Sequence, residues 1–290
     1  MTLELIEQAA AWREALDAAR AKGQQVGLVP TMGALHAGHM SLIRRASAEC
    51  DLVAVTDYVN PLQFGPSEDL ASYPANLARD CELAAEAGAQ VVFAPTTAEL
   101  WPHAPTTSVR VEGLTESLEG SSRPGHFDGV ATIVTKLFAL SGPCWAYFGE
   151  KDYQQLAVVR RMAADLSLPV DVIGCPIVRD PDGLALSSRN AYLTADERKV
   201  APHLYYALLA GKRAIEDADV SDPDAACDAM AASLSKQALF TLDYAEVTDP
   251  EDLSRPSRIE KEVRLLMAAR IGTTRLIDNL SATPPTSTDS

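Results

Sequence analysis

The sequence predicts an α/β protein, in which a doubly wound, mostly parallel sheet is followed by a smaller α+β domain. Short apolar runs alternate with helical segments from about residue 26 to residue 173, which is typical of a parallel sheet with helices on both faces. The alternation stops near Cys175, where a turn between two short strand-like runs indicates a hairpin. The length of 290 residues also favours two domains, because single cores rarely grow beyond roughly 250 to 300 residues.

The elements of the first domain follow from the spacing of its apolar residues. The charged start of the chain has a helical pattern, and this amphipathic helix is expected to end at about Ala21, before Gly23. Short apolar runs predict strands at residues 26–30, 52–56, 91–94, 145–148 and 170–173. Apolar residues at helical spacing predict the intervening helices at residues 39–46, 75–87, 130–140 and 153–166. We therefore expect the first domain to cover residues 1–175.

The second domain is expected over residues 176–280, and its elements have clear boundaries. Thr194 and Glu197 form a capping box, which predicts a long helix that ends near Ala218. Further elements are expected in the order helix, strand, strand, strand, at residues 223–237, 242–247, 263–269 and 275–278. Residues 281–290 contain no large apolar side chain and are expected to form a disordered tail.

Composition excludes several classes of protein. Forty acidic residues against 25 basic ones give a net charge of −15, which disfavours a nucleic-acid partner because a phosphodiester backbone would be repelled. There is no apolar run of about 18 residues and no export signal at the start, so we expect a cytoplasmic protein with no membrane partner. Five widely spaced cysteines without a CxxC pair are expected to be reduced thiols.

The turn after the first predicted strand of the sheet has the composition of a phosphate-binding site. Its sequence is PTMGALHAGH, residues 30–39, and it leads into a helix N-terminus. Gly33 and Gly38 allow close approach of the backbone to a ligand, and His36 and His39 can donate hydrogen bonds to phosphate oxygens. Neither GxGxxG nor GxxxxGK[ST] is present, which disfavours dinucleotide and P-loop folds. The spacing of the two histidines resembles the HxGH signature of the nucleotidyltransferase superfamily.

Four further segments lie at turns or at the start of the second domain. They are VNPLQFG, RPGHFDG, FGEKDYQQ and GLALSSRN, which begin at residues 59, 123, 148 and 183. Together with the histidine-containing turn, these segments closely resemble the pantothenate synthetase family from residue 26 to residue 193. The resemblance implies a Rossmann-like first domain, a homodimer, and a C-terminal domain that closes over the site.

The resemblance implies that ATP, pantoate and β-alanine are the substrates. Pantoate would form a pantoyl adenylate with release of pyrophosphate, and β-alanine would then displace AMP. A carboxylate is already ionised at pH 7, so the first step requires alignment and relief of negative charge rather than a base. The amine of β-alanine must be neutral when it attacks, and the sequence identifies no base for this step. Two alternatives are an HxGH enzyme acting on another acid or phosphate acceptor, and a non-catalytic ATP-binding protein.

The resemblance also assigns site residues. The implied catalytic residues are His36, His39, Lys151, Ser187, Ser188 and Arg189. The implied ATP-binding residues are Met32, His39, Gly149, Lys151, Asp152, Ser187, Ser188 and Arg189. Substrate binding is implied for Gln63 and Gln155, and Asn60, Tyr73 and Arg123 are assigned around the same substrate.

Two acidic residues raise separate questions. Mg²⁺ is expected to accompany ATP, and Asp80 is the candidate ligand because Arg79 stands where an acidic residue can stand in relatives. Relatives commonly have Ser-Ile-Phe before Val59, whereas this chain has Thr56, Asp57 and Tyr58. Since a carboxylate would repel an anionic acid, we expect Asp57 to point out of the substrate pocket.

Overall fold

The computed structural model describes residues 3–65, 70 and 73–285, and the chain divides into two compact units. The first unit comprises Met1–Glu150 and Gln154–Pro176, and the second comprises Lys151–Tyr153 and Ile177–Ser290. The change of unit after Pro176 lies one residue beyond the boundary expected from the sequence. Lys151–Tyr153 groups with the second unit, although it precedes this boundary in the sequence.

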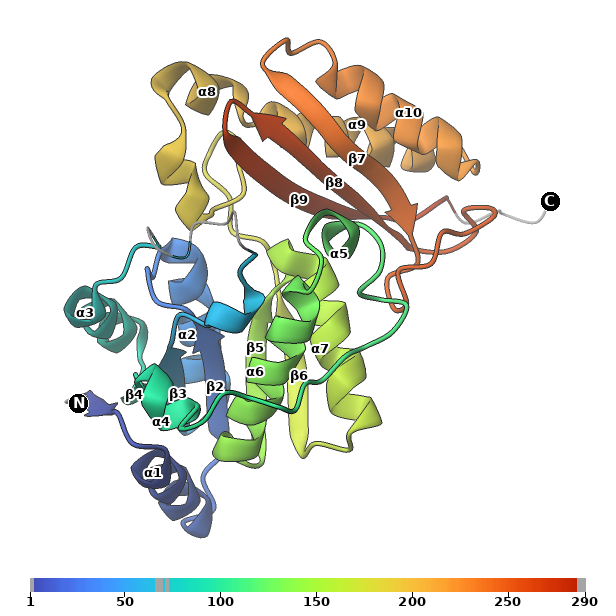
Figure 1. Cartoon of the computed structure of the whole chain (residues 1–290). Coiled ribbons are helices and arrows are strands. Elements are labelled where there is room, and N and C mark those ends of the chain that lie inside the picture. The colour runs from blue at the N-terminus through green and yellow to red at the C-terminus, as the bar shows by residue number, and fades with distance from the viewer. Residues whose placement is uncertain (1–2, 66–69, 71–72, 286–290) are drawn as a thin grey trace. The chain divides into compact units, whose positions relative to one another are not determined.

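The first unit is built on a six-stranded sheet in which every neighbouring pair of strands is parallel. The strands are β1 (Glu4–Ile6), β2 (Val26–Thr31), β3 (Leu52–Asp57), β4 (Val91–Phe93), β5 (Cys144–Gly149) and β6 (Val170–Cys175), in the spatial order β1-β4-β3-β2-β5-β6. The main helices are α1 (Ala9–Ala21), α2 (Ala37–Glu49), α3 (Leu77–Ala87), α6 (His126–Ser141) and α7 (Tyr153–Asp165) (Figure 1). Shorter helices are η1 (Pro61–Gln63), α4 (Thr97–Leu100) and α5 (Glu119–Ser122). The short helix η3 (Glu150–Asp152) begins in the first unit, and its last two residues group with the second. The predicted doubly wound α/β fold is confirmed.

Alternation of side chains along the strands explains why helices cover both faces of this sheet. Val29 on β2 packs in one core cluster with Ile43 of α2 and Ala84 of α3. On the other face, Trp12 of α1 stacks on Phe93 of β4, with ring centroids 5.0 Å apart. Successive residues of a strand point to opposite faces, so strands that are buried on both sides must be apolar throughout. This explains the continuous apolar runs from which the strands were predicted.

The second unit contains a three-stranded antiparallel sheet and helices. The strands are β7 (Phe240–Thr248), β8 (Val263–Ile271) and β9 (Thr274–Ala282), in the order β7-β8-β9. The helices are η4 (Ser188–Tyr192), α8 (Ala195–Val200), α9 (His203–Glu216) and α10 (Pro223–Leu234). Apolar side chains of α9, α10 and β8 form its core, including Leu208, Met230 and Met267. The smaller α+β unit is therefore present, and β9 includes the first two residues of the segment expected to be a tail. Residues 286–290 lie outside the described part.

Two predicted elements were wrong in detail. The chain does not begin with a helix, because residues Glu4–Ile6 form the short strand β1, which pairs with β4. Only Ile6 of this strand is buried, so the sequence contains no alternating pattern to indicate it. The helix expected from the capping box to Ala218 is divided into α8 and α9. Pro202 lies at the break, because proline has no backbone N–H for a continuous helix. The capping box itself is confirmed.

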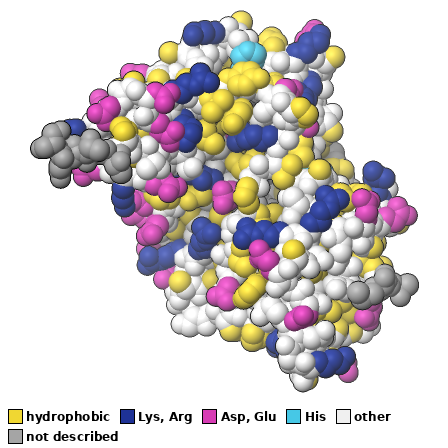
Figure 2. Space-filling model, turned by 180° about the vertical axis from the view of Figure 1, so that it is seen from behind, with side chains coloured by type: hydrophobic (Ala, Val, Ile, Leu, Met, Phe, Trp, Pro, Cys, Tyr) yellow, Lys and Arg dark blue, Asp and Glu magenta, His cyan; other side chains and the backbone are white. Residues whose placement is uncertain are grey.

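The surface and the cysteines add three observations. Acidic and basic side chains are interspersed on the face shown in Figure 2. No helix within the described ranges has the length and apolar character needed to span a membrane. All five cysteines are free thiols, of which Cys144 and Cys175 are buried and the other three are partly buried.

Candidate functional site

The candidate site of the first unit lies where β2, β3 and β5 end. β2 is the neighbour of both β3 and β5, and all three strands run in the same direction. Their carboxyl ends therefore lie at one edge of the sheet, where ligands bind in open α/β sheets. The histidines and the 60–63 turn lie in the segments that follow β2 and β3, and Gly149 is the last residue of β5.

The turn after β2 has an unusual backbone. Gly33 and Ala34 both have positive φ angles, of 77° and 52°. This left-handed conformation is disfavoured for alanine by roughly 1 to 2 kcal/mol, so neighbouring groups must hold it. Thr31 provides one contact, because its hydroxyl donates to the carbonyl of Thr56 at 2.7 Å and accepts from the Gly33 N–H at 3.1 Å.

Asp80 provides the second support of this turn. Its carboxylate is buried and accepts hydrogen bonds from the backbone N–H groups of Ala34 at 2.9 Å and Leu35 at 2.7 Å. A Cβ atom on residue 33 would overlap a carboxyl oxygen of Asp57 and would lie 3.2 Å from an oxygen of Asp80. Glycine at position 33 is therefore required both by its φ angle and by the two carboxyl groups beside it.

Asp57, at the end of β3, lies against Asp80 and the turn. The pKa of Asp57 is raised to about 6, mainly by burial of its carboxyl group. The negative charge of Asp80 and a hydrogen bond with it raise this pKa further. The Oδ2 atom of Asp57 is buried and has no hydrogen-bond partner among the described residues. Its carboxyl group is thus directed at the backbone of the turn and at a second carboxylate. Its orientation relative to pantoate stays a prediction.

The two histidines lie at the N-terminus of α2. His36 is the N-cap residue, and its Nδ1 atom accepts a hydrogen bond from the N–H of Gly38 at 3.1 Å. The neutral His36 ring therefore carries its proton on Nε2. The rings of His36 and His39 have centroids 4.2 Å apart. The structure thus brings both predicted histidines together at a helix end that has partial positive charge, which suits an anionic ligand.

A chain of amide contacts joins three other predicted residues. Asn60 donates through Nδ2 to Gln63 Oε1 at 3.0 Å and to the carbonyl of Gly129 at 3.2 Å. Gln63 donates in turn to the sulfur of Met32 at 3.0 Å. A Cβ atom on Gly129 would overlap the backbone of Leu62, so this glycine allows α6 to approach η1. Met32, Asn60 and Gln63 therefore form one cluster in the first unit.

His126 extends this cluster to Arg123 and was not assigned from the sequence. Its Nδ1 atom lies 2.8 Å from the carbonyl oxygen of Gln63, and its Nε2 atom lies 2.9 Å from Arg123. Because a carbonyl oxygen only accepts, Nδ1 donates to Gln63 and Nε2 accepts from the guanidinium group. The signal for His126 was its place in the RPGHFDG segment. Tyr73 packs edge to face on Phe64, with ring centroids 5.8 Å apart.

The segment after β5 contains a second residue that sequence reasoning missed. Gln154 is buried and accepts from the N–H of Glu119, and its amide donates to the carbonyls of Leu114 and Ser117 at 2.7 and 2.9 Å. It therefore fixes the 114–119 segment, whereas the neighbouring Gln155 is only partly buried. At Gly149, apart from the glycine itself and its two neighbours in the chain, no described atom lies within 4 Å of the position of a Cβ.

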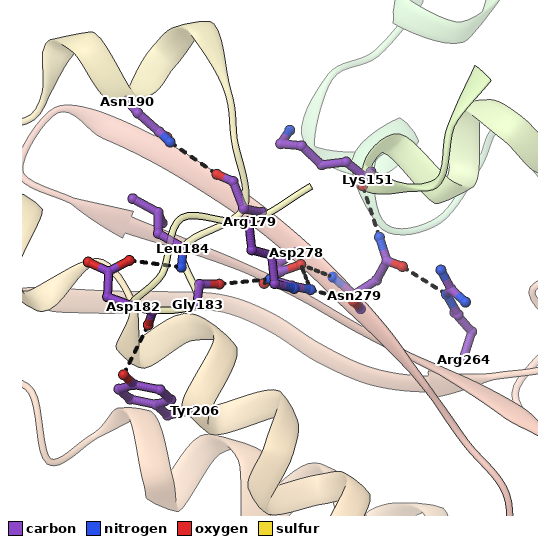
Figure 3. A network of polar contacts seen from close by, with 11 residues as sticks. Lys151, Arg179, Asp182, Gly183, Leu184, Asn190, Tyr206, Arg264, Asp278 and Asn279 are labelled. Carbon is purple, nitrogen blue, oxygen red and sulfur yellow. Dashed lines mark hydrogen bonds and ion pairs between the residues drawn. The ribbon is translucent and has the colours of Figure 1, made fainter. Parts of the chain in front are cut away.

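The remaining predicted residues belong to the second unit. Lys151 Nζ lies 3.6 Å from a carboxylate oxygen of Asp152. The hydroxyl of Ser187 accepts a hydrogen bond from the N–H of Arg189 at 3.3 Å and caps η4, so this serine has a local structural role. Ser188 and Arg189 follow as partly buried residues of the same short helix. Within this unit the structure places all five residues on two short segments, and Figure 3 shows Lys151 and its surroundings.

The assignment of Asp80 as a magnesium ligand stays a prediction, and the structure shows which contacts this carboxylate makes. Both oxygens of Asp80 accept backbone hydrogen bonds, and the side chain is buried beside a second carboxyl group. In the described ranges, no group of three or more His, Cys, Asp or Glu side chains is arranged to hold a metal ion. These contacts of Asp80 support the turn after β2.

Comparison with known proteins identifies the family. The family model described as pantoate-beta-alanine ligase matches residues 4–281. The chain belongs to this family. The resemblance found in the five sequence segments is thereby confirmed, and the family is one of ligases.

Curated relatives in this family match almost the whole chain. The pantothenate synthetase of Moorella thermoacetica is 48% identical over 278 residues, which are 96% of this chain and 98% of the relative. The pantothenate synthetase of Roseiflexus castenholzii is 52% identical over 254 residues, which are 88% of this chain and 91% of the relative.

Solved structures of the family share the fold. A pantothenate synthetase structure from Thermus thermophilus has a TM-score of 0.92 and 48% identity, and covers 97% of this chain and 100% of that one. A pantoate-beta-alanine ligase from Francisella tularensis, complexed with beta-gamma ATP and beta-alanine, has a TM-score of 0.79 and 32% identity. That match covers 96% of this chain and 97% of the Francisella chain.

Proposed function

We propose that this chain condenses pantoate with β-alanine to form pantothenate, using ATP and releasing pyrophosphate and AMP. The observation that carries the proposal is the family match over residues 4–281. Its relatives are named as pantothenate synthetases, which favours pantoate over another acid or phosphate acceptor. The complex of the Francisella ligase supports ATP and β-alanine as ligands of this chain as well.

In the first step, a carboxylate oxygen of pantoate attacks the α-phosphorus of ATP, and the bond from this phosphorus to pyrophosphate breaks. No base is needed, because the carboxylate is ionised at neutral pH. His36 donates from Nε2 to a phosphate oxygen, since its Nδ1 atom is occupied by Gly38, and His39 acts beside it. The N-terminus of α2 adds partial positive charge at the same place. These donors stabilise the negative charge that develops in the transition state.

The second unit supplies further groups to ATP. We assign Lys151, Ser187, Ser188 and Arg189 to the phosphate oxygens of ATP. Ser187 also caps the start of η4. Met32, Gly149 and Asp152 are assigned to the binding of the nucleotide. A carboxylate at Asp152 suits ribose hydroxyls because it accepts hydrogen bonds.

Pantoate binding is assigned to the amides of Gln63 and Gln155. An amide group offers a donor and an acceptor without charge, which suits a substrate that has a hydroxyl group beside a carboxylate. Asn60 orients Gln63 through its amide, and Arg123 is oriented through His126. Tyr73 is assigned to the surroundings of the same substrate.

In the second step, the neutral amine of β-alanine attacks the acyl carbon of the adenylate, and AMP leaves with the electrons of the broken C–O bond. We assign no side chain as the base for this amine. Mg²⁺ is proposed to arrive with ATP and to take most of its ligands from phosphate oxygens and water, as this ion commonly does, with Asp80 as the candidate protein ligand. A homodimeric state, a cytoplasmic location and a mobile C-terminal unit remain proposals carried by the family resemblance.

The test measures the two half-reactions separately. Pyrophosphate release should require both ATP and pantoate, and AMP release should follow when β-alanine is added. Replacement of His36 by Ala should reduce the rate of pyrophosphate release by about 10² to 10³, as for other preorganised donors. A reduction of less than fivefold would contradict the role of His36, and release without pantoate would indicate a different acceptor.

A further inference from the structure

The backbone of Lys151 is held by a side chain from β9. Asn279, a residue of β9, donates from Nδ2 to the carbonyl oxygen of Lys151 at 2.9 Å (Figure 3). Asn279 is only 1% exposed, so this bond is shielded from water. It joins two positions that are 128 residues apart in the sequence. Both positions belong to the second unit.

The amide of Asn279 is oriented from its other end. Its Oδ1 atom accepts a hydrogen bond from Nε of Arg264 at 2.8 Å, and Arg264 is itself buried. Rotation of the amide by 180° would direct its NH₂ group at a guanidinium donor and its oxygen at a carbonyl oxygen. Both contacts would be repulsive, so Arg264 fixes the orientation in which Asn279 donates to Lys151.

Further contacts hold Arg264 and the backbone of Asn279 in place. The guanidinium of Arg264 lies 4.0 Å from the ring centroid of Tyr153, and the hydroxyl of Tyr153 donates to the carbonyl of Pro250 at 3.1 Å. At β9, Asp278 accepts the N–H of Asn279 at 2.7 Å and pairs through both oxygens with Arg179 at 2.6 and 2.8 Å. The short segment that carries Lys151 is therefore attached to the antiparallel sheet at two points, Lys151 itself and Tyr153.

We propose that Asn279 is a positioning residue for Lys151, which fixes the backbone from which the ammonium group reaches the phosphate oxygens of ATP. This inference rests on the phosphate-binding role proposed for Lys151. Asn279 touches no reacting atom, and its effect passes through Lys151. A displacement of about 1 Å at a catalytic group can reduce a rate by about 10². The rate of pyrophosphate release should therefore respond to Asn279 only while Lys151 is present.

The experiment is a double-mutant cycle on pyrophosphate release from the full chain with saturating ATP and pantoate. Asn279→Asp retains an oxygen for Arg264 but loses the donor to Lys151, and it should reduce the rate by about 10- to 100-fold. In a Lys151→Ala background the same substitution should reduce the rate by less than twofold, because the group that Asn279 positions is gone. Thr274→Val, a substitution of similar shape at another buried position of β9, should leave the rate unchanged.

Two results would overturn the proposal, and they have different meanings. If Lys151→Ala itself reduces the rate by less than fivefold, the role of Lys151 is wrong and the positioning role falls with it. If Lys151→Ala has a large effect but Asn279→Asp reduces the rate equally in both backgrounds, or not at all, only the positioning role is wrong. Asn279→Ser provides a second variant that lacks the donor amide, and thermal unfolding checks that each variant is folded.

Discussion

Replacement of Asp57 by Asn isolates the effect of one buried carboxyl group on stability. In the native enzyme Asp57 lies beside Asp80 and under the turn that carries His36. The asparagine has nearly the same shape, cannot ionise, and can still donate a hydrogen bond to Asp80. We therefore expect the variant to fold and to be more stable than the native enzyme above the pH at which Asp57 ionises.

The magnitude follows from the pKa of Asp57, which burial and Asp80 raise from 3.8 to about 6. One pKa unit corresponds to ~1.4 kcal/mol, so this difference corresponds to about 3 kcal/mol if the site is fully shielded. Solvent screening of a partly buried group reduces the expected effect to about 1 to 2 kcal/mol. Since the folded state binds the proton more tightly, Asp57 favours folding below pH 3.8, and this contribution is lost as the pH rises through about 6.

The assay is urea unfolding of the native enzyme and of Asp57→Asn at pH 4.5 and pH 7.5. The advantage of the variant in free energy of unfolding should grow by about 1 kcal/mol between these values, because roughly a third of the total effect is already present at pH 4.5. Glu82→Gln is the matched control, because Glu82 is an exposed acid two residues after Asp80, and it should show no such change. An advantage that is constant with pH, or that shrinks at pH 7.5, would refute the reasoning.

Three further substitutions test the packing around the site. Asp80→Asn should lower the free energy of unfolding by about 1 to 3 kcal/mol and raise the KM for ATP, because an amide NH₂ group would face a backbone N–H of the turn. Urea unfolding measures the first effect and ATP titration the second. An unchanged KM would show that Asp80 does not support the conformation in which the turn binds ATP. Gly33→Ala should cost more stability than Gly23→Ala, since both glycines have positive φ angles but only Gly33 has carboxyl groups at the Cβ position. Equal decreases in thermal stability for the two variants would show that the carboxyl groups of Asp57 and Asp80 move aside and accommodate the Cβ atom. Gly129→Ala should destabilise the first unit by about 1 to 3 kcal/mol through overlap with Leu62, and unfolding at the native urea midpoint would contradict this.

The sequence predicted the fold well because both domains have strong periodic signals. The strands of the parallel sheet are buried on both faces, so each appears as an apolar run between turn residues. The capping box at Thr194 was equally local and was confirmed. The first strand was missed because three residues with one buried side chain form no pattern. The helix break at Pro202 was missed because amphipathic spacing continues on both sides of it.

The candidate site was predictable only where its residues are close together in the sequence. His36 and His39 lie three positions apart and next to a predicted strand end, and the structure places their rings together. Long-range partners could not be found in this way. Asp80 supports a turn that is more than 40 residues away, His126 contacts Gln63 across 63 residues, and Asn279 contacts Lys151 across 128 residues. These contacts depend on strand order and helix packing, which no local motif specifies.

The five free cysteines have a practical consequence for chemical modification. Burial raises the pKa of every one of these thiols, and that of Cys144 reaches about 12. Alkylating reagents attack the thiolate, whose population at neutral pH is therefore very small at these positions. A cysteine introduced at an exposed position should react with maleimide well before the native thiols do. Fluorescent probes can then be attached to either unit without first removing the native cysteines.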